Sequence, residues 1–372
     1  MKIVHVVEPF ASGIAVFVKS LVDNMKDDFH IIIHGERESV MKAAEVRKSF
    51  TGANVRFIKW NHAQREISLG KDWRAFLELY RILKKLKHDG DVDAVHLHSS
   101  KSGFLGRLAC KLADINNVVY TPNGAPFLVS TKKTKNFLYR IFEKVGDLFG
   151  GKVVCCSLSE MTAYRKLGIN AININNGVSV KTNTAVPDVK KEKGVFQVVT
   201  SARISNQKNP ALFNEIAKQF EHLDQFRFIW IGDGEDRKKL TASNITITGW
   251  VAPVISKKMI SNADVYLSTS NFEGLSFSVL EALALKKPVL LKDCVGNKDM
   301  VKSGLNGDLF DTAERAVIKI MQYANNPDML PLMGEYSNEF CRQDFNIKST
   351  SSMYRDLYNG NFDYNGSFNY SF

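Results

Sequence analysis

The chain has 372 residues, a formal net charge of +11, 44% hydrophobic and 24% charged residues, a composition typical of globular proteins rather than of disordered or fibrous ones. This length is too great for one small core and suits two domains. No apolar run is long enough to span a bilayer, and the first residues lack the basic, apolar and cleavage regions of a secretory signal. The five cysteines show neither metal-ligand spacing nor a pattern that suggests disulfide pairing. We therefore expect a reduced, cytoplasmic protein.

Positive charge is concentrated in the first half of the chain. Residues 1–180 carry 27 Lys and Arg against 17 Asp and Glu, a net charge of +10, whereas residues 181–372 carry 23 against 22, a net charge of +1. This asymmetry indicates an anionic partner for the first half, and nucleic acid and an anionic membrane surface both qualify. Because no nucleic-acid-binding motif is present, we expect the membrane surface and no nucleic acid.

Strands and helices alternate along the first 180 residues. Strands are predicted at 2–7, 30–34, 55–58, 94–98, 118–121, 152–157 and 173–175. Helices are predicted at 14–25, 73–86, 106–113, 132–149 and 159–166. Such alternation is typical of a Rossmann-like domain with a parallel sheet.

The second half repeats this pattern after a lysine-rich linker at 181–194, which contains Pro187 and Gly194. Strands are predicted at 196–201, 227–231, 245–248 and 263–270, and a last helix at 345–357. The final residues, 359–372, show no periodicity, and we expect them to be poorly ordered.

The most informative segment is 263–290, a strand followed by a polar loop, a helix and a further strand that begins at Pro288. In open parallel sheets, ligands bind outside the carboxyl ends of the strands, where this loop must lie. Backbone N–H groups at a helix start lack intrahelical partners and, with the helix dipole, favour an anion. The predicted anion site comprises Gly274, Leu275 and Ser276, and two carboxylates frame it, Glu273 and Glu281.

The spacing of the two carboxylates, with seven residues between Glu273 and Glu281, resembles the E-x7-E signature of retaining glycosyltransferases of family 4. Without further context, two glutamates at this spacing would be a solvated loop residue and a charged residue on a helix surface. The strands predicted before and after them make the match to the family signature more specific. The resemblance implies an α/β protein of the GT-B fold, in which two Rossmann-like domains with parallel sheets face each other across a cleft. The implied parts are an acceptor domain at 1–180, a nucleotide-sugar domain at 195–344 and a helix at 345–358 that crosses back to the first domain.

The resemblance extends to the loop 202–210, where Ala202 replaces the glycine of the family's G-R-L-x(3–4)-K-G segment. It implies that Arg203 and Lys208 bind the donor diphosphate, and two cations there can stabilise a leaving phosphate without a metal. It further implies that Glu273 holds the donor sugar and Glu281 the ribose. The nucleotide base is expected against backbone of the segment that follows the strand 245–248, namely Gly249, Trp250 and Val251. The turn 232–235 has no clear catalytic role, and no general base and no metal are implied.

Three residues of the first half are expected on the acceptor or sugar side. Gly13 partly matches a Gly-Gly pair of the family, and His98 ends a strand, whereas His96 is expected to pack within it. Asn123 stands where many relatives carry a histidine, and its amide can position a ligand but cannot take a proton. A turn asparagine explains Asn123 equally well.

Two further segments have competing interpretations. Asp91 and Asp93 have the form of a metal-binding D-x-D motif but precede a strand, so we predict a solvated turn. The basic and apolar helix 132–149 could be an interfacial helix on anionic lipid, or it could pack its apolar face on the sheet. We expect the apolar stripe in the core and lipid contact for some of its lysines.

The sequence thus predicts a retaining, metal-independent hexosyltransferase that uses a nucleotide sugar, with UDP favoured over GDP-mannose. A lipid-diphosphate-linked saccharide acceptor in capsule or O-antigen synthesis, at the inner face of the cell membrane, would explain both the charge and the missing spans. One alternative is a UDP-N-acetylglucosamine 2-epimerase of the same fold, against which Asn123 counts because that reaction needs acid and base groups. Another is a catalytically silent assembly scaffold, against which the intact set of Arg203, Lys208, Glu273 and Glu281 counts.

Overall fold

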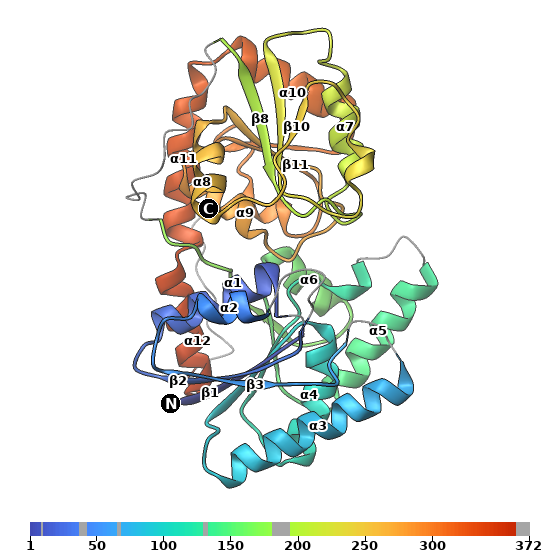
Figure 1. The fold of residues 1–372 in the computed structure, drawn as a ribbon, viewed down its shortest axis with the longest axis vertical. Coiled ribbons are helices and arrows are strands. Elements are labelled where there is room, and N and C mark those ends of the chain that lie inside the picture. Colours follow the sequence, from blue (N-terminus) through green and yellow to red (C-terminus); the bar gives the residue numbers. More distant parts are fainter. Residues whose placement is uncertain (9, 37–42, 65–67, 129–132, 181–193, 362–372) are drawn as a thin grey trace. The chain divides into compact units, whose positions relative to one another are not determined.

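The computed structural model describes residues 1–8, 10–36, 43–64, 68–128, 133–180 and 194–361. It divides into two compact units, Met1–Asn176 with Ile347–Phe372, and Gly177–Asn346. Each unit is an α/β structure built on one parallel sheet (Figure 1), which confirms the predicted fold class of two Rossmann-like domains. The predicted linker lies outside the described residues except for Gly194, and the predicted tail does so except for residues 359–361.

The sheet of the first unit has seven strands in the order β3-β2-β1-β4-β5-β6-β7. They are β1 (Lys2–Val7), β2 (Phe29–His34), β3 (Val55–Lys59), β4 (Ala94–His98), β5 (Val118–Thr121), β6 (Lys152–Cys155) and β7 (Ala171–Asn173). Strands β1 and β4 pair in parallel at the point where the chain reverses its direction of travel across the sheet. In doubly wound sheets this switch point is where ligands bind.

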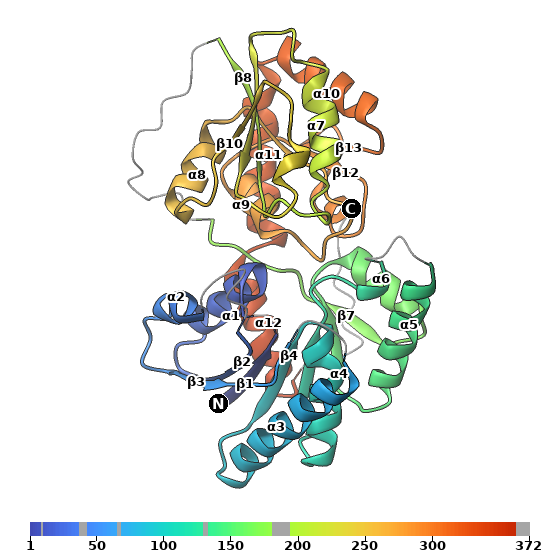
Figure 2. The same ribbon diagram turned by 45° about the vertical axis from the view of Figure 1, so that its right-hand side comes forward.

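Helices cover both faces of this sheet (Figure 2). They are α1 (Ser12–Asn24), α2 (Ala43–Lys48), α3 (Leu69–His88), α4 (Ser100–Leu112), η1 (Pro126–Leu128), α5 (Lys133–Asp147), α6 (Leu158–Lys166) and, from the end of the chain, α12 (Ile347–Tyr358). Apolar residues of α3 and α4 pack on one face, against Val4, Ile31 and Leu97. Helices α1 and α12 contact each other and cover the other face.

The second unit has a six-stranded sheet in the order β10-β9-β8-β11-β12-β13. Its strands are β8 (Phe196–Ser201), β9 (Phe226–Ile231), β10 (Ile245–Ile247), β11 (Val265–Ser268), β12 (Val289–Lys292) and β13 (Gly307–Phe310). Its helices are α7 (Pro210–Lys218), η2 (Arg237–Lys239), α8 (Pro253–Asn262), α9 (Phe277–Ala284), η3 (Asn297–Met300), α10 (Ala313–Asn325) and α11 (Met329–Asp344). Because every pair of neighbouring strands is parallel, the loops after the strands gather at one edge of the sheet.

Most predicted strands are confirmed, but the predicted helix 106–113 begins too late. Helix α4 starts at Ser100, because its glycines serve close packing rather than a loop. A Cβ at Gly103 would lie 2.2 Å from the ring of Tyr120, and one at Gly106 would lie 2.5 Å from Leu97. The strand predicted at 173–175 is Ala171–Asn173 and therefore ends two residues earlier than predicted.

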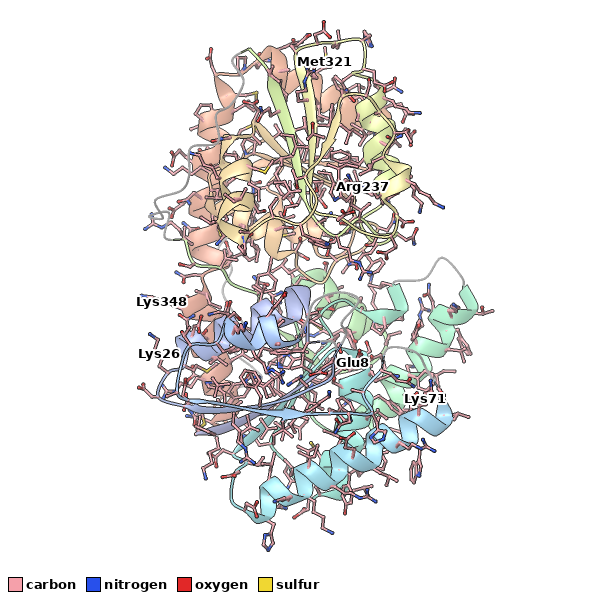
Figure 3. The ribbon with its side chains drawn as sticks, in the orientation of Figure 1. Glu8, Lys26, Lys71, Arg237, Met321 and Lys348 are labelled. Atoms are coloured by element: carbon pink, nitrogen blue, oxygen red, sulfur yellow. The ribbon has the colours of Figure 1, made fainter. Side chains whose placement is uncertain are left out.

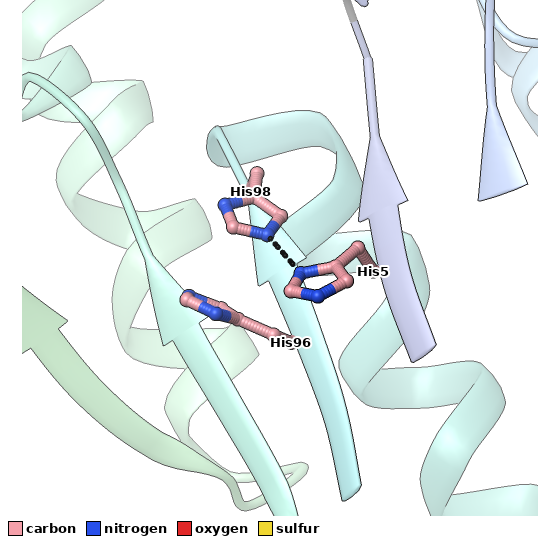
Figure 4. Close-up of side chains that lie close together, drawn as sticks. All are labelled: His5, His96 and His98. Atoms are coloured by element: carbon pink, nitrogen blue, oxygen red, sulfur yellow. Dashed lines mark hydrogen bonds between the residues drawn. The ribbon is translucent and has the colours of Figure 1, made fainter. Parts of the chain in front are cut away.

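Five buried histidines lie on the face of the first sheet that α1 and α12 cover, and besides His34 they are His5, His30, His96 and His98. His5 Nδ1 is 3.1 Å from His98 Nε2, and His5 Nε2 is 3.1 Å from His30 Nδ1. His96 uses both ring nitrogens, 2.6 Å from the hydroxyl of Tyr358 and 2.7 Å from that of Thr121. His96 is thus a packed strand residue, as predicted, and the histidine rings form a layer of the core. Figure 4 shows three of these rings, with the hydrogen bond between His5 and His98.

We predict that this histidine layer makes the protein acid-sensitive. Burial lowers the pKa of His98 to about 3 and lowers the pKa values of His5 and His96 well below the ordinary value. An unfolded histidine has a pKa of about 6.5, so between these values the unfolded state binds more protons than the folded state. Stability is therefore complete above about pH 6.5 and declines as the pH falls, by about 2 kcal/mol per buried histidine at about pH 5.

Urea unfolding followed by circular dichroism at about pH 7 and about pH 5 measures this loss. His98→Asn should reduce the pH dependence, whereas His88→Asn, at an exposed position, should leave it unchanged. Equal free energies of unfolding at the two pH values would contradict the prediction.

Candidate active site

A buried ion pair joins two loops at the carboxyl edge of the second sheet. Lys208 lies in the loop after β8 and Glu273 in the loop after β11, and these two strands are neighbours. Lys208 Nζ lies 2.5 Å from Glu273 Oε1, and the two side chains are 20% and 7% exposed. Burial by itself would lower the pKa of Lys208, but the attraction of Glu273 outweighs it and raises that pKa, so Lys208 is a cation at neutral pH.

Hydrogen bonds between the same two loops hold this pair in place. Gln207 Nε2 donates to Phe272 O at 3.2 Å and lies 3.5 Å from Glu273 Oε2, and Thr269 Oγ1 donates to Lys208 O at 2.8 Å. Glu273 N donates to the carbonyl oxygen of Val295 at 3.1 Å. The position of Glu273 is therefore set by three loops and not by the ion pair alone.

Gly296 lets the loop after β12 approach the loop that carries Glu273. It has φ +85°, and a Cβ there would lie 2.5 Å from Gly274 O and 2.9 Å from the Cβ of Glu273. Any larger residue would both strain the backbone and displace Glu273. Gly296 is therefore needed where this loop passes the loop of Glu273.

Arg203, the second predicted cation, is held by a carboxylate that the sequence analysis did not single out. Its Nε and one terminal nitrogen each lie 3.0 Å from Glu235 Oε2, and Glu235 belongs to the turn after β9. The two side chains are 33% and 54% exposed, so an anionic ligand can reach Arg203 and replace Glu235. The sequence could have indicated Glu235, because it is an acidic residue just after β9, the strand that pairs with β8.

The second glutamate of the signature lies apart from this ion pair. Glu281 is on α9, where its Oε1 lies 3.3 Å from Lys257 Nζ of α8. Leu275 and Ser276, which precede α9, are buried, and Ser276 Oγ is 3.1 Å from Ser278 Oγ. The structure thus brings Glu273 together with Lys208, whereas Glu281 pairs with neither predicted cation.

The segment expected against the nucleotide base follows β10. Gly249 has φ +70° and bridges Gly232 of the neighbouring turn. Trp250 is 65% exposed, and Val251 follows it before α8 begins. Gly249 is thus in a conformation that favours glycine, and the exposed Trp250 follows the residue that bridges the turn of Glu235.

A hollow on the second unit lies elsewhere and is not part of this arrangement. It is lined by Phe196, Phe226 and Pro327, and the first two begin β8 and β9. It therefore lies at the amino edge of the sheet. In Figure 3, Met321 marks this hollow and Arg237 marks η2, which follows β9.

Comparison with known proteins identifies the family. Residues 11–181 match the family described as "Glycosyltransferase Family 4", and residues 182–340 match "Glycosyl transferases group 1". The chain belongs to glycosyltransferase family 4.

Relatives of this family 4 glycosyltransferase include two proteins named as galactosyltransferases. It is 26% identical over 321 residues to the UDP-Gal:alpha-D-GlcNAc-diphosphoundecaprenol alpha-1,3-galactosyltransferase of Escherichia coli, covering 79% of this chain and 81% of the relative. It is 34% identical over 159 residues to the lipopolysaccharide 1,6-galactosyltransferase of Salmonella typhimurium, covering 38% of this chain and 43% of the relative. A role in polysaccharide biosynthesis agrees with these relatives.

Solved structures confirm the GT-B fold of this glycosyltransferase. Sucrose-phosphate synthase of Thermosynechococcus elongatus superposes with a TM-score of 0.78 at 15% identity, covering 97% of this chain and 99% of that one. HepE of Anabaena, in complex with UDP and glucose, superposes with a TM-score of 0.75 at 16% identity, covering 96% and 98% of the two chains.

The residues expected on the acceptor side of the glycosyltransferase lie in the first unit. Gly13 is exposed in the first turn of α1, which begins at Ser12 and thus two residues before the predicted helix start. Asn123 has φ 57°, and its Nδ2 donates to Thr121 O at 3.2 Å, which favours the turn role. His98 is fully buried against His5, so its expected contact with a ligand is wrong: the side chain points into the core instead.

Glu160 positions the Asn123 loop, and the sequence analysis missed it. Its carboxylate accepts from Gly124 N at 2.8 Å and from Cys156 N at 3.0 Å, and its own N–H donates to Ser157 Oγ at 3.3 Å. The spacing of Ser157 and Glu160 is that of a capping box at a helix start, which was the available signal. Glu160 thus ties the start of α6 to the loop after β5.

Two groups of residues have the composition of metal ligands. His5, His96 and His98 carry ring nitrogens within 4.8 Å of one another. Core hydrogen bonds engage both ring nitrogens of His5 and His96 and Nε2 of His98, whereas His98 Nδ1 has no hydrogen-bond partner among the described residues. Asp91 and Asp93 precede β4, where Asp91 pairs with Lys2 at 2.9 Å and Asp93 accepts from Lys2 N at 2.7 Å. Among the described helices, none combines the length and apolarity needed to cross a membrane.

Proposed function

We propose that this glycosyltransferase is retaining and metal-independent, and that it transfers a sugar from a UDP-sugar to a lipid-diphosphate-linked saccharide. The observation that carries the proposal is the ion pair of Lys208 with the buried Glu273, next to the loop of Arg203. Two cations at the carboxyl edge of a parallel sheet are suited to a diphosphate that gains negative charge as the sugar departs.

Each residue of the arrangement has a distinct part in this chemistry. Lys208 and Arg203 stabilise the leaving diphosphate, and Glu235 releases Arg203 when the diphosphate arrives. Glu273 accepts hydrogen bonds from the donor sugar, and Glu281 accepts them from the ribose. The start of α9, at Gly274 to Ser276, faces the phosphate or the sugar. No protein group acts as general base, because the departing phosphate oxygen takes the acceptor proton.

The relatives and structural neighbours support the choice of donor and acceptor. The Escherichia coli relative is named for UDP-Gal and for a diphosphoundecaprenol-linked acceptor, and HepE was solved with UDP and glucose. The net charge of +10 on residues 1–180 favours an anionic acceptor on the first unit. GDP-mannose is the second choice of donor.

A thermal-shift screen against UDP, GDP, ADP and dTDP tests the donor. UDP should stabilise the protein, by about 2.7 kcal/mol at a concentration of about one hundred times its Kd. A selective shift with GDP would replace UDP by GDP-mannose. Absence of any shift, together with absence of donor hydrolysis, would favour the catalytically silent scaffold, and interconversion of the donor sugar without transfer would favour the epimerase.

We predict that transfer and donor hydrolysis survive EDTA. The cations that meet the diphosphate are side chains, so removal of divalent metal should change the rate by less than about twofold. Activity with excess EDTA, compared with activity with added Mg²⁺ or Mn²⁺, measures this. Strict dependence on either metal would show that Asp91 and Asp93, or another group, were assigned wrongly.

A further inference from the structure

Helix α5 buries a polar face and exposes an apolar one. Glu143 and Gly146 are buried, whereas the apolar positions of the helix are 37% to 62% exposed. We call these positions the α5 apolar face: Phe137, Leu138, Ile141, Phe142 and Val145. They recur at the spacing of a single helix face. The expectation that this stripe is consumed in the core is therefore wrong.

A buried polar network explains the orientation of α5. Glu143 Oε2 lies 3.5 Å from a terminal nitrogen of Arg107, and Glu143 Oε1 accepts from the hydroxyl of Tyr120 at 2.9 Å. The guanidinium of Arg107 lies 4.5 Å from the centre of the Tyr120 ring. A Cβ at Gly146 would lie 2.2 Å from the same guanidinium, so the helix approaches through its glycine. Breaking this buried ion pair would be costly, and the apolar face is consequently held outward.

Exposed basic side chains border the apolar face on both sides. At 100° per residue, Arg140 and Lys144 lie along one border and Lys135 along the other. Leu148, just after the helix, is 73% exposed and extends the apolar surface. The predicted contributions of Lys132 and Lys133 concern side chains outside the described residues.

We propose that the α5 apolar face inserts into the headgroup region of an anionic lipid bilayer. An apolar face with cationic borders is the pattern of helices that lie in a membrane interface. The basic side chains along its borders also indicate which partner binds the α5 apolar face. A second copy of the chain would bring like charges together, whereas anionic headgroups neutralise them. The proposal goes beyond the chemistry of the donor and stands on α5 alone, although it places the protein where a lipid-linked acceptor would be.

Vesicle co-sedimentation tests the proposal, with phosphatidylcholine alone and with added phosphatidylglycerol. Wild type should bind the anionic vesicles at about 0.1 M salt and retain part of this binding at about 1 M, where the Debye length is about 3 Å. Phe137→Ser with Ile141→Ser should weaken binding at least about 100-fold at both salt concentrations. Lys135→Glu, Arg140→Glu and Lys144→Glu together should weaken it by a similar factor at low salt and much less at high salt.

Ile318→Ser with Leu332→Ser is the matched control, because these residues are 56% and 62% exposed on the other unit. It should bind vesicles as wild type does. All variants should keep their melting temperature and their shift with UDP, so a failure of the donor assignment would be seen separately. Wild-type binding by the Phe137 and Ile141 variant would overturn the proposal. If that variant instead converted a wild-type dimer to a monomer, with vesicle binding unchanged, α5 would be a subunit interface.

Discussion

Lys208→Met is expected to reduce glycosyl transfer by about 10²–10³-fold and to lower the free energy of unfolding by about 3 kcal/mol. The loss of activity follows from removal of a cation that stabilises the leaving diphosphate. The loss of stability follows because the carboxylate of Glu273, 7% exposed, would lose the cation that pairs with it, and removal of one partner from a buried ion pair is costly. Lys208 is itself 20% exposed, which places the expected cost at the lower end for buried pairs.

A double-mutant cycle with Glu273→Gln separates the two effects. Urea unfolding should show that the double variant is less destabilised than the sum of the single variants, because neither charge is then left alone. Transfer should be strongly reduced in all three variants. Lys286→Met is the matched control, since Lys286 and Glu335 form an exposed pair at 2.7 Å that should contribute about 0–1 kcal/mol. Additive destabilisation in the cycle would contradict the assigned ion pair.

Arg203→Ala should also reduce transfer by about 10²–10³-fold, which is about 2.7–4 kcal/mol of transition-state stabilisation. Its unfolding free energy should change by less than about 0.5 kcal/mol, because Arg203 and Glu235 are 33% and 54% exposed. A variant that is fully folded but inactive is the signature of a residue that acts on the donor. Steady-state kinetics with the donor varied measures the effect.

Two companion variants sharpen this test. Arg342→Ala, at an exposed position of α11, removes the same type of side chain away from the loops and should have wild-type activity. Glu235→Gln removes the carboxylate that competes with the diphosphate for Arg203, so UDP should bind at least as tightly as in wild type. Wild-type turnover by Arg203→Ala would show that the diphosphate is held elsewhere.

Local sequence patterns predicted the loops of the candidate site but not the partners of their charged residues. Strand periodicity places Arg203, Lys208 and Glu273 in loops that follow strands, and parallel strands present such loops at a single edge. The pairing partners depend on strand order, which no local pattern contains. Glu235 meets Arg203 because β9 lies beside β8, and Glu281 turns to Lys257 because α8 packs beside α9.

The sequence by itself determined the two α/β units, most of their strands and the loops that carry the glycosyltransferase signature, because these depend on residue periodicity and on neighbours in the chain. Only the tertiary structure decided which side chains face the core. His98 ends a strand as predicted, yet it points inward to His5 of a strand far away in the sequence. Helix α5 has the predicted apolar stripe, yet Glu143 meets Arg107 and Tyr120 and turns that stripe outward. Both outcomes follow from contacts between distant segments, which set the energy of burying each face and leave no periodic trace in the chain.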